Sequence, residues 1–390
     1  MEVPQTYVVP CQSHPSRPEP ACEVIHVPKV TVNLPLRSYD IIVEVDCISR
    51  AGSLIREAGL TGRAALISDD NVANHYADGV RSSLEEAGFE VSSHLIAAGE
   101  SSKSMEQAQS LCRALIEHQH DRSSFVVALG GGVVGDLAGF VAAIFYRGIP
   151  CVQIPTTIVA QVDSSVGGKT GVNVPEGKNL LGAFKQPRLV LADPGVLRTL
   201  PHNVFCEGFA EVIKHAAIRD ASMLLELESM DPLNQEVAPR LIAANLAIKA
   251  RIVEEDERET SGTRALLNFG HTVGHAIEAS AEYGTLLHGE AISLGVRAAL
   301  FLSERKAGFS REETRRLLAI QQRWNLPLRL ELDISTESIM TALTRDKKFT
   351  SGQVRFVLLK ALGEAFISSE VTPADIVEAI EHLRLPQELT

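Results

Sequence analysis

Short hydrophobic segments alternate with amphipathic segments along the first half of the chain. The hydrophobic segments are rich in β-branched residues and predict strands at residues 41–45, 64–68, 91–96, 125–129, 151–154 and 189–192. Between most of them, apolar residues recur at helical spacing, as in residues 71–87 and 104–118. Strands that alternate with helices predict a mainly parallel sheet with helices packed on its faces.

After about residue 200, long amphipathic segments replace this alternation. They predict helices at 204–218, 237–255, 264–281, 289–307 and 311–324, and a hairpin-like pair of strands at 354–359 and 364–368. We therefore expect an N-terminal Rossmann-like α/β domain at residues 29–200 and a mostly helical domain at residues 201–390. Residues 1–28 hold six of the 18 prolines and show no sustained periodicity, which predicts a proline-rich tail.

Composition and charge exclude several classes of protein. With 45% hydrophobic and 22% charged residues, the chain is neither disordered nor collagen-like. The net charge of −12 argues against nucleic acid or an anionic membrane as a partner. Six cysteines without a Cys-x-x-Cys pair are typical of reduced thiols, and the N-terminus lacks a secretory pattern, so we expect a cytoplasmic protein.

A glycine-rich turn follows the predicted strand 125–129. Gly130, Gly132 and Gly135 satisfy G-x-G-x-x-G between a strand and a helix. Without Cβ atoms, such a backbone can approach a pyrophosphate, and the helix N-terminus supplies N–H donors. The alternative is a tight turn with a purely structural role.

The position of this turn differs from the usual dinucleotide fingerprint. It follows the fourth predicted strand, and no strand ending in an acid lies about 20 residues later to contact a ribose. Asp69, Asp70 and Asn71 close the second predicted strand, so they are the candidates for that contact.

A second segment rich in small and polar residues spans residues 155–179. Lys169 and Lys178 lie there among glycines and hydroxyl side chains. Backbone N–H groups and two ammonium groups suit a phosphate, so we expect a phosphate-binding loop. The alternative is a pair of solvated surface lysines.

Three short segments of the helical half contain possible metal ligands. Glu211 lies in an apolar helix, where a bare acid is costly unless it has a partner. His271 and His275 share one helical face at i, i+4 spacing, and His288 stands at a predicted helix start. One carboxylate and two imidazoles are the ligand set of a catalytic zinc, and spacing alone favours His271 and His275. Hydrogen-bonded core histidines are the alternative.

Basic residues also occur singly in apolar surroundings. They are Arg147, Lys214, Lys249, Arg264 and Arg355. Each alone is typical of a helix-surface ion pair. Together with the two lysines of the 155–179 segment, they suggest a substrate that carries more than one negative charge.

Several sequence blocks, in this order, carry a resemblance to a known family. The blocks are residues 130–140, 153–157, 161–171, 177–179, 210–214, 264–275 and 287–290. They resemble the 3-dehydroquinate synthase family of the sugar phosphate cyclase superfamily, from about residue 39 to the C-terminus. Residues 256–264 are one residue longer than the family pattern.

The resemblance implies NAD⁺ and a divalent metal, normally zinc with cobalt as a substitute, in a cleft between the two domains. The implied metal ligands are Glu211, His271 and His288, which replaces the histidine pair that spacing favours. The implied catalytic residues are Asp163, Lys169, Lys214, Arg264, Asn268 and His275. The implied substrate contacts are Arg147, Lys169, Lys178, Asn179, Lys214, Lys249, Arg264, Asn268, His275 and Arg355. The implied cofactor contacts are Asp69, Asn71, Glu100, Lys103, Gly130, Gly131, Gly132, Asp136, Thr156, Thr157, Lys169, Lys178 and Asn179.

The resemblance also implies a reaction and an assembly. The family, a group of homodimers, converts 3-deoxy-arabino-heptulosonate 7-phosphate into 3-dehydroquinate and phosphate in the shikimate pathway. NAD⁺ oxidises the C5 hydroxyl, phosphate is eliminated, C5 is reduced again, and the opened ring closes by an intramolecular aldol step. The alternatives are a sister cyclase that uses sedoheptulose 7-phosphate or an amino analogue, a metal-dependent alcohol dehydrogenase, and a catalytically inactive NAD-binding regulator.

Overall fold

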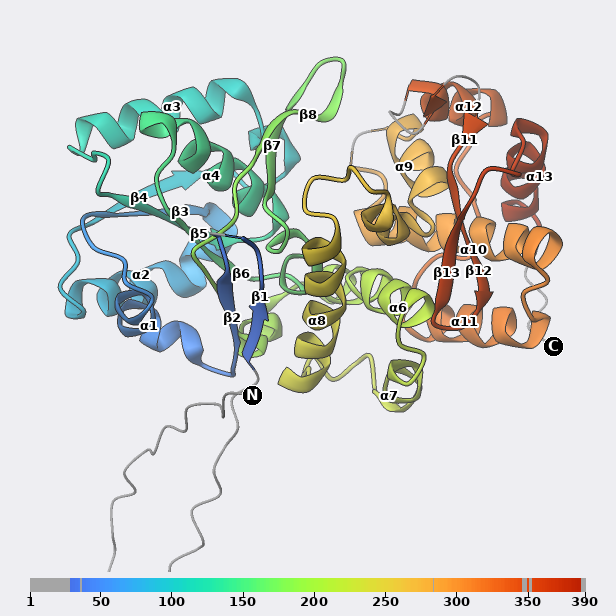
Figure 1. Ribbon diagram of the computed structural model, residues 1–390, viewed down its shortest axis with the longest axis horizontal. Helices are drawn as coiled ribbons and strands as arrows, with labels where there is room; N and C mark the ends of the chain where they lie inside the picture. The colour runs from blue at the N-terminus through green and yellow to red at the C-terminus, as the bar shows by residue number, and fades with distance from the viewer. Residues whose placement is uncertain (1–28, 36, 283, 346–348, 351–352, 387–390) are drawn as a thin grey trace, which may run out of the picture.

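An α/β half and a helical half lie side by side in the computed structural model (Figure 1). It describes residues 29–386 except 36, 283, 346–348 and 351–352. The predicted tail at residues 1–28 lies outside the described residues. None of the helices in the described ranges combines the length and the apolar character needed to cross a membrane.

The α/β half is built on a seven-stranded sheet. In sheet order, the strands are β1 (Lys29–Val32), β2 (Tyr39–Val43), β9 (Leu189–Ala192), β6 (Cys151–Pro155), β5 (Phe125–Gly130), β3 (Ala64–Asp69) and β4 (Val91–Ile96). Only β1 and β2 pair antiparallel; the other neighbours are parallel. The predicted strands and the parallel sheet are confirmed, with β1 as an additional edge strand.

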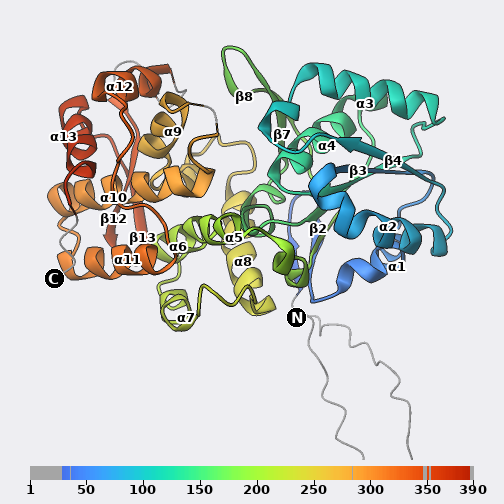
Figure 2. The same cartoon turned by 180° about the vertical axis from the view of Figure 1, so that it is seen from behind.

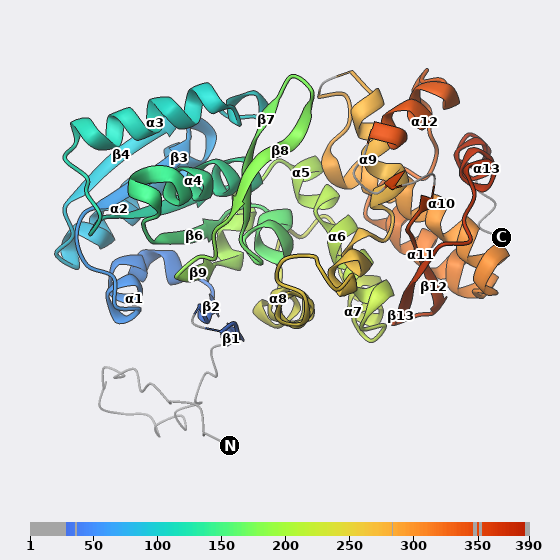
Figure 3. The ribbon, with the colours of Figure 1, turned by 45° about the horizontal axis from the view of Figure 1, so that its top comes forward.

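Helices cover both faces of this sheet (Figure 3). Leu66 and Val127 point to the face covered by α1 (Ala51–Glu57) and α2 (Asp70–Glu86). Their chain neighbours Ile67 and Ala128 point to the face covered by α3 (Met105–Glu117) and α4 (Gly132–Ile144). A strand that is buried on both faces needs apolar residues throughout, which explains the continuous hydrophobic runs in the sequence.

Nine helices make up most of the described part of the second half. They are α5 (His202–Glu207), α6 (Phe209–Ile218), α7 (Met223–Ser229), α8 (Pro239–Glu255), α9 (His271–Ser280), α10 (His288–Ala307), α11 (Arg311–Arg323), α12 (Thr336–Arg345) and α13 (Pro373–Leu383). Two small hairpins accompany them, β10 (Phe349–Thr350) with β11 (Gln353–Val354), and β12 (Phe356–Ala361) with β13 (Glu364–Ser368). The predicted α/β plus helical fold is confirmed.

Two predicted helices are interrupted by glycines. The segment 204–218 divides at Gly208, where a Cβ atom would lie 2.5 Å from Cβ of Ile158. The prediction of a single helix over residues 264–281 is wrong. Gly270 takes φ +79° and separates the 3₁₀ turn η6 (Thr263–Asn268) from α9. The second break matters for the site, because it lets α9 begin at His271.

The predicted phosphate-binding loop is partly a hairpin. Strands β7 (Lys169–Val174) and β8 (Gly177–Phe184) pair antiparallel, and the hairpin stands between the two halves at the top of Figure 1. Gly171 and Gly182 face each other closely, since a Cβ on Gly182 would lie 2.3 Å from the carbonyl oxygen of Thr170. The loop prediction for residues 155–179 is therefore wrong at residues 169–174 and 177–179, which are strands.

The two halves share one hydrophobic core. Ile41 and Val190 of the sheet belong to the same cluster as Leu246 of α8 and Phe209 of α6. Helix α8 packs on β1 and β2, and Figure 2 shows α5, α6 and α8 between the sheet and the outer helices. A domain boundary at residue 200 stays a prediction.

Candidate functional site

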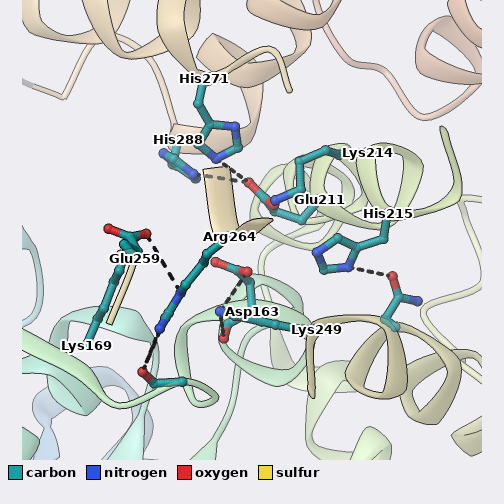
Figure 4. A network of polar contacts seen from close by, with 12 residues as sticks. Asp163, Lys169, Glu211, Lys214, His215, Lys249, Glu259, Arg264, His271 and His288 are labelled. Carbon is teal, nitrogen blue, oxygen red and sulfur yellow. Dashed lines mark hydrogen bonds and ion pairs between the residues drawn. The ribbon is translucent and has the colours of Figure 1, made fainter. Parts of the chain in front are cut away.

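One carboxylate oxygen lies between two imidazoles in the helical half (Figure 4). Glu211 of α6 is fully buried, and its Oε1 is 3.3 Å from Nε2 of His271 and 3.3 Å from Nε2 of His288. The two histidines are the first residues of α9 and α10. Three helices therefore deliver one ligand atom each to the same point.

These three atoms fit a divalent metal ion. A tetrahedral zinc with ligands at about 2.0–2.1 Å has neighbouring ligand atoms about 3.3–3.4 Å apart, which matches both distances from Glu211 Oε1. The other ring nitrogens are engaged, since His271 Nδ1 is 3.1 Å from the carbonyl oxygen of Phe269 and His288 Nδ1 is 3.4 Å from Oε2 of Glu278. Because these contacts occupy Nδ1, both rings present Nε2 to the centre.

His275 lies beside this group, one helical turn after His271. Its ring centroid is 5.0 Å from that of His271 and 5.7 Å from that of His288. The pair favoured by spacing thus does exist on one face of α9. The oxygen of Glu211, however, faces His271 and His288.

Burial and neighbouring charges shift the pKa values of these groups. Burial opposes the charge of Glu211, but Lys214, which contacts Oε2, and His271 together hold its pKa well below the usual range. Burial lowers the pKa of His271, whereas in His288 the hydrogen bonds to Glu211 and Glu278 outweigh burial and raise the pKa to about 10. A carboxylate that stays charged in a buried place suits a cation.

A buried lysine and an aspartate lie next to the metal-binding group. Lys249 Nζ of α8 is 2.7 Å from Oδ1 of Asp163 and also contacts the carbonyl oxygen of Asp163, in η4 (Ala160–Ser164). Burial lowers the pKa of Lys249 to about 8, although Asp163 opposes the shift. Burial would raise the pKa of Asp163, but Lys249 and Lys214 outweigh it and lower the pKa below its usual range.

His215, next to Lys214 on α6, points its ring into the same region. Its Nδ1 is 3.1 Å from Oδ1 of Asn245, whose amide nitrogen donates to the carbonyl oxygen of Leu241 at 2.7 Å. These contacts leave the proton of a neutral ring on Nδ1. Burial lowers the pKa of His215 to about 3, so the ring stays neutral.

Two cations share one carboxylate near this region (Figure 4). Glu259 contacts Lys169, and its Oε1 is 3.7 Å from Nε of Arg264. The Arg264 side chain is almost completely buried and donates to the carbonyl oxygens of Gly167 and Glu257. The site therefore already holds an anionic group between Lys169 and Arg264.

The carboxyl ends of β5, β6 and β3 form a second polar edge. Lys103 contacts Asp136 of α4, and Glu100 Oε1 accepts a hydrogen bond from Nδ2 of Asn173 at 2.8 Å. The buried hydroxyl of Thr156 has no hydrogen-bond partner within the described residues. This edge of a parallel sheet is where doubly wound folds bind nucleotides.

The glycines of this edge are explained by close packing. A Cβ on Gly130 would lie 2.6 Å from Cγ2 of Val134, and a Cβ on Gly131 would lie 3.1 Å from Cγ2 of Thr157. A Cβ on Gly132 would lie 3.3 Å from Oγ of Ser164. The glycines are therefore accounted for by packing within the protein, and the unpartnered Thr156 hydroxyl is the observation at this edge that fits a bound cofactor.

The remaining predicted cofactor residues lie near this edge. Asp69 is the N-cap of α2 and accepts from the backbone of Val72 at 2.9 Å. Asn71 follows in the first turn of α2. The backbone N–H of Asn179 donates to Oδ1 of Asn173 at 2.9 Å, which ties β8 to β7.

Three predicted substrate contacts lie outside the central group. Asn268 ends η6, three residues before His271. Arg355 lies against the loop that carries Glu259, since its Nη2 is 3.0 Å from a Cβ built on Gly262. Arg147 is exposed and follows the C-terminal end of α4. It lies at the amino-terminal ends of the parallel strands, whereas the Gly130 turn lies at their carboxyl ends.

Four acidic or basic residues of the site are absent from the sequence-based prediction. They are Glu207, His215, Glu259 and Glu278. Glu207 accepts from the backbone N–H of Gly289 at 2.6 Å, and burial raises its pKa to about 7. Only Glu278 has a sequence signal, because it follows His275 at i+3 and therefore shares its helical face.

Comparison with known proteins identifies the family. Residues 93–207 match the family described as 3-dehydroquinate synthase N-terminal, and residues 208–349 match 3-dehydroquinate synthase C-terminal. The 3-dehydroquinate synthase of Nostoc punctiforme is 43% identical over 357 residues, which cover 90% of this chain and 98% of the relative.

Solved structures of two further enzymes share the fold. A 2-epi-5-epi-valiolone synthase from Streptomyces hygroscopicus, solved with NAD⁺ and Zn²⁺, is 28% identical with a TM-score of 0.80 over 90% of this chain and 98% of the other. A 2-deoxy-scyllo-inosose synthase, solved with carbaglucose-6-phosphate, NAD⁺ and Co²⁺, is 24% identical with a TM-score of 0.82 over 91% of this chain and 99% of the other.

Proposed function

The chain belongs to the 3-dehydroquinate synthase family, and on this premise we propose how its residues divide the family reaction among them. The protein is a phosphate-eliminating carbon–oxygen lyase of the shikimate pathway that uses NAD⁺ and a divalent metal. Its reaction converts 3-deoxy-arabino-heptulosonate 7-phosphate into 3-dehydroquinate and phosphate. The observation that supports the division of roles is the meeting of Glu211, His271 and His288 beside buried cations.

Glu211, His271 and His288 hold the metal ion. When bound, Zn²⁺, or Co²⁺ in its place, supplies a Lewis acid that makes a neighbouring substrate hydroxyl more acidic. Lys214 keeps the second oxygen of Glu211 occupied, so the carboxylate offers Oε1 to the centre. His275 lies beside these ligands and Asn268 ends the 3₁₀ turn before α9, and both contact the substrate.

Lys249, positioned by Asp163, exchanges a proton next to the metal site. A lysine with a pKa of about 8 exchanges a proton more readily near neutral pH than an ordinary lysine does. Asp163 fixes the position of Lys249 Nζ through its carboxylate and its backbone carbonyl. The proton is therefore exchanged at Nζ of Lys249.

Lys169 and Arg264 bind an anionic group of the substrate. Both contact the carboxylate of Glu259, so an incoming phosphate or carboxylate would replace one anion by another next to the buried guanidinium of Arg264. Lys178, Asn179 and Arg355 complete the rim of the site from β8 and from the segment before β12.

The carboxyl edge of the sheet binds NAD⁺. The Gly130–Gly132 turn and the N-terminus of α4 would hold the pyrophosphate. The other residues that would hold the cofactor are Asp69, Asn71, Glu100, Lys103, Asp136, Thr156 and Thr157. When bound, NAD⁺ would supply a hydride acceptor and donor for C5 of the substrate. The backbone supplies uncharged donors at this edge.

The assembly and location follow from the same premise. We propose a cytoplasmic homodimer of α/β and helical domains that meet near residue 200, without nucleic-acid or membrane partners. Arg147 supports the dimer, because it lies at the far edge of its own sheet from the Gly130 turn. A substrate contact by Arg147 therefore requires a second copy of the chain.

One experiment tests the function. The purified protein is incubated with 3-deoxy-arabino-heptulosonate 7-phosphate, catalytic NAD⁺ and Zn²⁺, and phosphate, 3-dehydroquinate and NADH are followed together. Equal amounts of phosphate and 3-dehydroquinate without accumulating NADH are expected. Turnover of sedoheptulose 7-phosphate alone would transfer the assignment to a sister cyclase.

The metal ligands are tested by His271→Ala. Loss of turnover with an unchanged circular dichroism spectrum is expected, because two ligands remain where catalytic zinc needs three. A variant that keeps most of its activity would refute the assignment of His271.

A further inference from the structure

Glu278 connects two parts of the site that lie on different elements. It belongs to α9, and its carboxylate is mostly buried. Oε2 is 3.4 Å from Nδ1 of His288, the first residue of α10. Oε1 is 2.7 Å from Nζ of Lys178, near the start of β8.

The two proposed histidine ligands differ in what holds them. His271 is largely buried, and its Nδ1 faces a carbonyl oxygen of the backbone two residues earlier. The His288 side chain is 33% exposed, and its Nδ1 faces the carboxylate of Glu278. The orientation of His288 therefore depends on a side chain, whereas that of His271 depends on the local backbone.

We propose that Glu278 is the positioning residue of His288 and links the metal centre to the β7–β8 hairpin through Lys178. The inference rests on the proposed function, because it takes His288 as a ligand of a divalent ion. A carboxylate that accepts the Nδ1 proton of a histidine fixes the ring and makes Nε2 a better donor to a metal. Lys178 balances the charge of the second oxygen.

The hairpin extends this connection toward the cofactor edge. Asn173 of β7 accepts from the backbone of Asn179 through Oδ1 and donates to Glu100 through Nδ2. The backbone N–H of Asn173 also donates to the carbonyl oxygen of Lys103 at 2.8 Å. A continuous set of polar contacts therefore runs from Glu100 and Lys103 to the hairpin, which presents Lys178 to Glu278.

The test measures metal binding without turnover. Co²⁺ is titrated into the metal-free, full-length protein, and the visible absorption of the bound ion is recorded in competition with a chelator. Glu278→Gln is expected to weaken Co²⁺ binding by about 10–100-fold and to change the spectrum, because an amide binds the ring proton less strongly than a carboxylate. Far-UV circular dichroism of the metal-free variant reports whether it is folded.

Two matched variants separate positioning from general damage. Glu290→Gln changes another carboxylate near His288, one that accepts from the backbone N–H of Leu287 at 2.8 Å, and should leave Co²⁺ affinity unchanged. Lys178→Met should bind Co²⁺ as tightly as the wild type or more tightly. Without the lysine, the negative charge of Glu278 interacts with His288 alone.

Three outcomes would overturn the inference. They are a Glu278→Gln affinity within twofold of the wild type, an equal loss in Glu290→Gln, and a tenfold loss in Lys178→Met. Failure of the wild type itself to bind Co²⁺ would overturn the proposed metal ligands as well, so the two failures are distinguishable.

Discussion

The two polar regions of this molecule differ in the chemical groups that form them. The cofactor edge of the sheet combines backbone, in the Gly130–Gly132 turn and at the N-terminus of α4, with the ion pairs of Lys103 to Asp136 and Glu100. The metal-binding region consists of charged side chains, and Glu211 and Lys214 are almost completely buried. Backbone donors carry no net charge that must be desolvated, whereas a buried charge is stable only with its partner. In the metal-binding region, the loss of one charged residue should therefore destabilise its buried partner as well. At the sheet edge, a substitution should affect only its own contacts.

The largest effect is expected for Glu211→Ala. It leaves the buried ammonium of Lys214 without its partner, so the free energy of unfolding should fall by about 3–5 kcal/mol. Turnover should vanish, since a metal ligand is lost. Urea unfolding and phosphate release measure the two effects.

A double variant sharpens this result. Glu211→Gln combined with Lys214→Met removes both charges and should recover most of the stability but no activity. A Glu211→Ala protein as stable as the wild type would show that the charges of this region are not interdependent.

The corresponding change at the sheet edge is Asp136→Asn. Lys103 loses its closest carboxylate but keeps Glu100, whose Oε1 is 4.0 Å from Nζ, so a loss of about 1.5–3 kcal/mol is expected. The KM for NAD⁺ should rise. If unfolding shows a loss as large as that of Glu211→Ala, the contrast between the regions is wrong.

Acid should weaken the sheet half through His94, over a pH range in which the buried His215 of the metal-binding region also contributes. Burial, with His118 and His120 nearby, lowers the pKa of His94 to about 4. The unfolded chain therefore takes up the proton first, and stability present above about pH 6.5 is lost as the pH falls toward 4. The loss from His94, after solvent screening, should be about 1–2 kcal/mol.

Unfolding of the wild type and His94→Gln at several pH values checks this expectation. His94→Gln should flatten the pH dependence, and the exposed His75→Gln should leave it unchanged. A dependence that both variants share would assign the titration to other groups.

The smallest effect on stability is expected for Gly131→Ala. Its φ of −72° is open to alanine, and the new Cβ would meet the side chain of Thr157, with Cγ2 at 3.1 Å and Oγ1 at 3.7 Å. The free energy of unfolding should change by less than about 1 kcal/mol, while the KM for NAD⁺ rises because the backbone is shielded. A loss of stability without a change in KM would make the turn purely structural.

Much of the fold follows from the sequence because burial leaves a periodic pattern. Strands buried on both faces appear as continuous apolar runs, and β3 and β5 lie as predicted. The β7–β8 hairpin leaves no such pattern, since most residues of β8 are exposed. It therefore looks like a loop.

The site is less predictable because its geometry arises between elements. Glu211 stands out as an acid in an apolar helix. Spacing compares residues only within one helix, so it favours His271 with His275 and cannot show that α10 brings His288 to the same oxygen. Glu259 looks like an ordinary surface acid until the fold places cations beside it, and Glu278 is marked in the sequence only by its i+3 spacing from His275.

The core shared by the two halves has a consequence for synthesis on the ribosome. Strands β1 and β2 emerge early, but β9 and the helix α8 that covers them follow more than a hundred residues later. Until then, the apolar side chains of Ile41 and Val43 have no native cover. The centre of the sheet can form while the chain is still growing, whereas its β1–β2 edge must wait for α8. A chain that stops at residue 200 should therefore expose this edge and aggregate.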